Sequence, residues 1–81
     1  MTEQEIYDRL TPLFQDVLDN DDVVPTPELT ARDVDEWDSL SHIRLVVAVE
    51  QDFGVSFAAA EIARLENVGQ FVALIRSKLG A

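Results

Sequence analysis

Apolar residues recur every three or four positions along most of this chain, the spacing that places side chains on one face of an α-helix. The pattern occurs in three longer segments and one short segment. We therefore expect an all-α fold, a small four-helix bundle with three longer helices plus one short helix and a long ordered loop between helices 1 and 2. Residues 1–81 are expected to form a single domain.

The first helix is expected over about residues 3–18. Thr2, followed three residues later by Glu5, forms a capping box. Pro12 removes the amide that would bond the carbonyl of Asp8, so two short helices with Thr11 as a fresh cap are an alternative. The apolar spacing continues across the proline, so we predict one helix with a kink, buried through Ile6, Leu10, Leu13, Phe14, Val17 and Leu18.

Residues 19–37 contain two prolines, many acidic residues and no sustained apolar period. This composition predicts a loop. A loop of this length in a compact domain is usually functional or contains a short element of its own, and residues 30–33 (Thr-Ala-Arg-Asp) are suited to one helical turn.

The second helix is expected to begin at Asp38, whose carboxylate suits an N-cap that accepts from the amide of Leu40 or Ser41. Ser39 is then the first helical residue, at a solvent-facing corner, and Gly54 is a natural stop. Trp37 and His42 occupy the two positions that pack together in a hydrophobic staple.

Apolar residues of this second helix fall on two sides of a helical wheel. The wider stripe is assigned to the core and comprises His42, Leu45, Val46, Val49 and Phe53. The shorter row lies beside Ser39 and is assigned to a half-exposed partner surface, comprising Leu40, Ile43 and Val47.

The last part of the chain completes the bundle. Ala59 to Leu65 is expected to form the short third helix, burying Ile62 and Leu65. Asn67 then caps a fourth helix, which turns Val68, Phe71, Val72, Ile75 and Leu79 inward.

Charge and residue usage exclude several functions. With 6 basic and 16 acidic residues, the formal net charge is −10, which disfavours nucleic acid and anionic membranes as partners. The chain has no cysteine and one histidine, so no metal site is predicted. Residues 1–10 lack the basic and apolar regions of a signal peptide, and we expect a cytoplasmic monomer.

The sequence Asp38-Ser39-Leu40 at a helix start, the acidic loop before it and the segment EQDFGV at residues 50–55 together resemble an acyl carrier protein. The resemblance covers nearly the whole chain. It implies that Ser39 receives a 4′-phosphopantetheine group from coenzyme A, with Asp38 and Leu40 beside it at the attachment site. It also implies acyl cargo held as thioesters, and a protein that is not itself an enzyme.

The partners implied by the resemblance are a phosphopantetheinyl transferase, an acyl- or aminoacyl-loading ligase, and synthase or acyltransferase enzymes. The first helical position suits a phosphodiester, because free amides and the helix dipole both favour negative charge there. No base of the chain's own is evident for Ser39, so activation and Mg²⁺ must come from the transferase.

Other interpretations of these residues remain open at this stage. Ser39 is otherwise an ordinary residue of a helix start. Ser39, His42 and Asp38 could form a hydrolase site, because residues three apart share a helix face. A helical adaptor without a prosthetic group, binding a partner helix through Leu40, Ile43 and Val47, is the alternative function.

Arg44 departs from the pattern of the family. Fatty-acid carriers typically present several acids on the exposed face of this helix, whereas here Glu50 and Asp52 occur only near its end. Trp37 stands where small or aliphatic residues are common in the family. We therefore expect a specialised carrier, with Arg44 part of the partner surface. The cargo could be aminoacyl, glyceryl-type, polyketide or long-chain hydroxyacyl.

Overall fold

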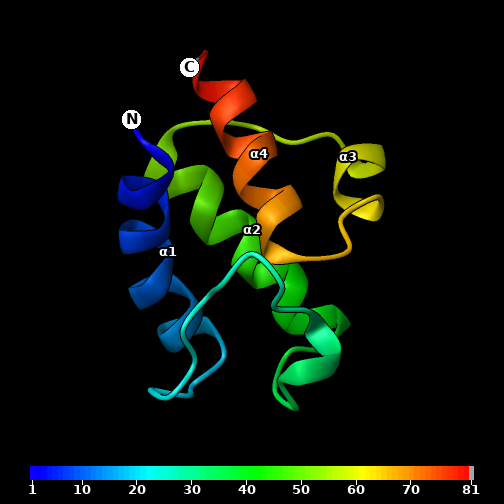
Figure 1. The fold of residues 1–81 in the computed structure, drawn as a ribbon. Coiled ribbons are helices and arrows are strands. Elements are labelled where there is room, and N and C mark those ends of the chain that lie inside the picture. The colour runs from blue at the N-terminus through cyan, green and yellow to red at the C-terminus, as the bar shows by residue number, and fades with distance from the viewer. Residues whose placement is uncertain (81) are drawn as a thin grey trace.

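The computed structural model describes residues 1–80, which fold into helices without a β-strand. The helices are α1 (Glu3–Val17), α2 (Ser39–Phe53), α3 (Ala59–Ala63) and α4 (Val68–Leu79), with one 3₁₀ turn, η1 (Ala31–Asp33). Figure 1 shows the long connection from α1 to α2 crossing one end of the bundle, opposite the two termini. The predicted all-α bundle of three longer helices and one short helix is confirmed.

Helix α1 is continuous through Pro12, as the apolar spacing predicted. Thr2 and Glu5 form the expected capping box, in which each side chain accepts a hydrogen bond from the other residue's backbone N–H. Next to the proline, the Thr11 hydroxyl donates to the carbonyl of Tyr7 over 2.9 Å. The cap and the apolar face therefore outweigh the one backbone hydrogen bond that Pro12 cannot make.

One hydrophobic core joins the elements, and α1 packs against both α2 and α4. Burial of these side chains is the main favourable term in the stability of the fold. The buried apolar residues are Ile6, Leu10, Phe14, Leu18, Val23, Val34, Trp37, Leu45, Val46, Val49, Phe53, Val68, Phe71, Val72 and Ile75.

The connection between α1 and α2 is ordered by the core and by the start of α4. It buries Val23, Val34 and Trp37. The first two amides of α4 donate to its carbonyls, Val68 N–H to Leu29 O and Gly69 N–H to Pro27 O, each over 3.0 Å. A Cβ atom at residue 69 would lie 3.1 Å from the Pro27 carbonyl oxygen, so a glycine suits this close approach.

Helix α3 is shorter than predicted. It ends at Ala63, two residues before the expected end at Leu65, because Arg64 N–H and Leu65 N–H bond back by three residues and close the last turn. Ile62 and Leu65, which were expected to be buried, are only partly buried. The predicted cap of α4 is confirmed, since the Asn67 side chain accepts from Gln70 N–H.

None of the helices formed by residues 1–80 has the length and apolar character that a membrane crossing requires.

Candidate functional site

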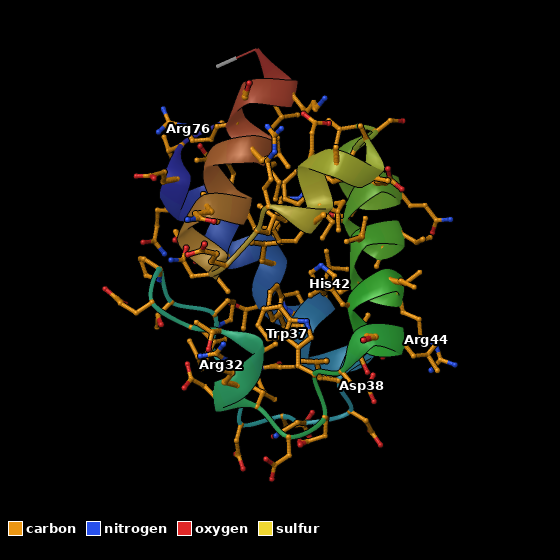
Figure 2. The ribbon with its side chains drawn as sticks, turned by 90° about the vertical axis from the view of Figure 1, so that its right-hand side faces the viewer. Arg32, Trp37, Asp38, His42, Arg44 and Arg76 are labelled. Carbon is orange, nitrogen blue, oxygen red and sulfur yellow. The ribbon has the colours of Figure 1, made fainter. Side chains whose placement is uncertain are left out.

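Ser39 is the first residue of α2 and is exposed. Asp38 precedes it as the N-cap, in extended backbone conformation, and its carboxylate accepts from Ser41 N–H over 2.9 Å. This bond lowers the pKa of Asp38, which keeps the cap ionised. The predicted cap and the predicted position of Ser39 are both confirmed, and Figure 2 shows Asp38 where the α2 ribbon begins.

The two serines of the first turn of α2 differ in their hydrogen bonding. The Ser41 hydroxyl donates to the carbonyl of Glu36 over 2.7 Å. The Ser39 hydroxyl forms no hydrogen bond with any other group of residues 1–80. Ser39 therefore presents a free, accessible hydroxyl, whereas the Ser41 hydroxyl helps to hold the loop against the helix.

The surroundings of Ser39 suit a phosphate group. The backbone N–H group of Ser39 makes no hydrogen bond within residues 1–80, whereas the Asp38 carboxylate accepts from Ser41 N–H and also interacts with Leu40 N–H. The free N–H of Ser39 lies at the positive end of the α2 dipole. A phosphodiester on the Ser39 oxygen could accept from it.

Trp37 and His42 form the contact predicted between them. The Trp37 indole N–H donates to His42 Nδ1 over 3.2 Å, and the two rings stack with centroids 6.1 Å apart. The assignment of His42 to the core stripe was wrong, because its side chain is only half-buried. Burial nevertheless lowers the pKa of His42, which favours the neutral ring.

The alternative hydrolase site is not assembled. His42 Nδ1 already accepts from Trp37, and the Asp38 carboxylate is bonded to the Ser41 amide and not to the imidazole. A serine hydrolase needs the histidine nitrogens free to bond the serine on one side and the acid on the other. Residues 1–80 also contain no group of three His, Asp or Glu side chains that could hold a metal ion.

The row assigned to a partner surface is exposed as predicted. The exposed fractions are 58% for Leu40, 61% for Ile43 and 44% for Val47. Arg44 lies among them, is exposed, and forms no ion pair within residues 1–80. Figure 2 shows its side chain pointing away from the body of the protein. This face of α2 therefore combines apolar side chains with one free positive charge.

Both acidic residues of α2 have partners within the chain. The Glu50 carboxylate accepts from Phe57 N–H over 2.8 Å, and the Asp52 carboxylate pairs with Arg9 over 3.0 Å. Arg9 also stacks on the Phe53 ring, 4.6 Å from its centroid. No local sequence pattern indicates these contacts, because the partners belong to other segments. Neither carboxylate of α2 is therefore without a partner, whereas Arg44 has none within residues 1–80.

A groove beside Ser39 was also missed by sequence reasoning. It has a volume of about 450 Å³ and lies between the start of α2 and the α3 region, lined by Ala31, Trp37, Asp38, Ser39, His42, Ile62, Ala63 and Leu65. These residues come from η1, from the start of α2 shortly after it, and from the α3 region, which is distant in the sequence. The groove exists because η1 and α3 flank the start of α2, which no local pattern indicates.

Comparisons with known proteins agree with this geometry. Residues 8–75 match the family model described as "Phosphopantetheine attachment site". The chain is 32% identical over 78 residues to an acyl carrier protein of Picosynechococcus sp., covering 96% of each chain, and 31% identical over 77 residues to one of Thermotoga maritima, covering 95% of each. The solution structure of holo acyl carrier protein from Geobacter metallireducens is similar, with a TM-score of 0.86 and 44% identity over 91% of this chain and 85% of that one.

Proposed function

The chain belongs to the acyl carrier protein family, and on this premise we propose that Ser39 is the residue to which its 4′-phosphopantetheine is attached. The chain is a carrier and not a catalyst. The thiol of the covalently bound prosthetic group holds acyl groups as thioesters, and the protein passes them between partner enzymes. We further propose that residues 1–81 act as one carrier domain, since α1, α2 and α4 share one core.

The free hydroxyl of Ser39 carries this assignment. It is exposed at the positive end of α2, whereas the Ser41 hydroxyl is engaged with Glu36. Asp38 fixes where the helix begins, and Leu40 follows Ser39 in the first turn with its side chain exposed. Because His42 Nδ1 is occupied, the base that activates Ser39 must come from the phosphopantetheinyl transferase.

Intact mass tests this function. Purified protein incubated with coenzyme A, Mg²⁺ and a broad-specificity phosphopantetheinyl transferase is expected to gain the mass of one phosphopantetheinyl group, and only one. Omission of coenzyme A is the control. If the wild-type chain gains no mass with several transferases, the adaptor without a prosthetic group becomes the better interpretation of the exposed row on α2.

We propose that this carrier serves a specialised pathway, with a dedicated loading ligase, synthase or acyltransferase. The support is the charge of the α2 surface. Arg44 is free and exposed, and the two acids of α2 are bonded within the chain. An enzyme with a basic docking patch would meet a like charge here, whereas a partner with an acidic or neutral surface would fit.

Reversal of the charge at residue 44 is expected to change partner choice. Arg44→Glu should raise the rate at which a malonyl transferase of fatty-acid synthesis loads the holo protein. The gain corresponds to about 1 kcal/mol at an exposed rim, or roughly fivefold at low salt, and should shrink at high salt.

Arg32→Glu is the matched control, since Arg32 is also exposed and without an ion pair within residues 1–80 but points away on the other side of the molecule (Figure 2). Equal rates for wild type and Arg44→Glu at low salt would show that residue 44 does not steer the choice of partner.

A further inference from the structure

A much smaller cavity shares part of its lining with the groove beside Ser39. The cavity has a volume of about 60 Å³ and shares Trp37, His42 and Leu65 with the groove, while Phe71 of the core forms part of its lining. A phosphopantetheine arm attached to Ser39 would begin at the groove. Trp37 and His42, which line both spaces, stand between the groove and the core.

The Trp37–His42 pair is held in place by contacts between its two rings and by the Phe14 ring behind Trp37. Its members are joined by the 3.2 Å hydrogen bond and by ring stacking. Behind them, the Phe14 ring meets Trp37 edge-on, with centroids 5.3 Å apart, and Trp37 is only 8% exposed. For the pair to open, it must lose both a hydrogen bond and packing against the core, so it forms a stable wall.

The space behind this wall is too small for an alkyl chain. An apolar cavity of about 150 Å³ takes up benzene, which has six carbons. A cavity of about 60 Å³ therefore accommodates on the order of two carbons. A longer chain attached through Ser39 has to remain in the open groove, where much of its surface stays in contact with water.

His42 also offers a hydrogen-bond donor at this place. Because Nδ1 accepts from Trp37, the neutral ring carries its hydrogen on Nε2. The Nε2–H group makes no hydrogen bond within residues 1–80. Glu66 and Asn67 add polar groups to the cavity lining. The cavity lining is mostly apolar, so these few polar groups mark the places where cargo that can accept a hydrogen bond is favoured.

We propose that the Trp37–His42 pair selects the cargo of this carrier. The pair closes the core to long alkyl chains. When the phosphopantetheine arm folds back along the groove, His42 Nε2–H donates to a hydroxyl or carbonyl oxygen of a short acyl group of about two to four carbons at its end. This inference rests on the proposed attachment at Ser39. It makes Trp37 and His42 specificity-determining residues, although neither carries the acyl group.

A series of acyl forms of the holo protein tests the size limit. The forms are acetyl, butyryl, 3-hydroxybutyryl, hexanoyl and octanoyl. The folding equilibrium constant of each acylated protein is measured by urea unfolding, and the constants are compared. Burial of one methylene multiplies such a constant by about four, so the four extra methylenes of octanoyl over butyryl would raise it on the order of 200-fold if buried. We expect a change of less than about twofold. A rise that continues with each added methylene would overturn the proposal.

The donor is tested by comparing 3-hydroxybutyryl with butyryl. The hydroxylated form is expected to shift the His42 Nε2 resonance in the NMR spectrum and to raise the folding constant, whereas butyryl should do neither. His42→Phe keeps a ring beside Trp37 and removes the donor, so the difference between the two acyl forms should disappear. Identical His42 resonances in the two wild-type forms would overturn the role of Nε2–H.

Replacement of Trp37 by a smaller residue should open space in the core for a longer acyl chain. In Trp37→Leu, octanoyl is expected to stabilise the fold at least tenfold more than butyryl does. Phe57→Leu also replaces an aromatic ring, at a partly buried position that lines neither the groove nor the cavity, so it is the control and should keep the wild-type behaviour. Should Trp37→Leu not fold, the wild-type series decides alone. Absence of any loading on the wild type, seen by mass, would contradict the proposed attachment and not the size limit.

Discussion

Ser39→Ala is expected to remain completely unmodified by a phosphopantetheinyl transferase under conditions in which the wild-type chain is fully converted. The hydroxyl oxygen is the atom that becomes part of the phosphodiester, and alanine has none. The folded state should survive, because the Ser39 side chain is exposed and forms no hydrogen bond within residues 1–80. Intact mass shows whether the variant is modified, and circular dichroism shows whether it is folded.

Ser41→Ala is the matched control for that experiment. It removes a hydroxyl two residues along the same helix turn, and with it the 2.7 Å bond to Glu36. Loss of this bond should weaken the fold by about 1 kcal/mol while modification proceeds to completion. The opposite pattern, with Ser39→Ala modified and Ser41→Ala unmodified, would move the attachment point to Ser41.

Phe14→Ala is expected to remove a large part of the stability of the fold. Phe14 is 0% exposed and lies against Trp37. Truncation of a buried phenylalanine typically costs about 3–5 kcal/mol, because apolar contacts are lost and a cavity remains. A domain of this size has a total of roughly 4–12 kcal/mol. We therefore expect the midpoint of thermal unfolding to fall by at least about 12 °C.

Val24→Ala is the control for the core truncation, since Val24 is 59% exposed in the same loop that buries Val23. It should change the stability by less than about 0.5 kcal/mol. Urea unfolding of both variants gives the comparison. A loss of under 1 kcal/mol for Phe14→Ala would mean that the contact between α1 and Trp37 does not hold the loop against the bundle.

The features that were predicted correctly from the sequence depend on neighbouring residues. These features are the capping box of Thr2, the N-cap Asp38, and Gly54, which ends α2 in the left-handed conformation. Each involves residues within one helical turn. The position of Ser39 follows directly from that N-cap. For this reason, the best-predicted part of the candidate site is the place of Ser39 at the start of α2.

The features that were missed depend on contacts between distant segments. Burial of His42 is set by Trp37 on one side and by the groove toward α3 on the other. The partners of Glu50 and Asp52 lie in the loop before α3 and in α1. Periodicity within α2 identifies which residues share a face, but it contains no information on which elements cover that face.

The most direct test of the attachment site is to locate the modification within the chain after conversion by the transferase. Cleavage after Arg32 and Arg44 releases residues 33–44, which contain both Ser39 and Ser41. Fragmentation of this peptide in a mass spectrometer distinguishes the two serines. We predict the phosphopantetheinyl mass on Ser39 in every modified molecule. The same mass on Ser41, or on the peptides that contain Ser56 or Ser77, would contradict the assignment.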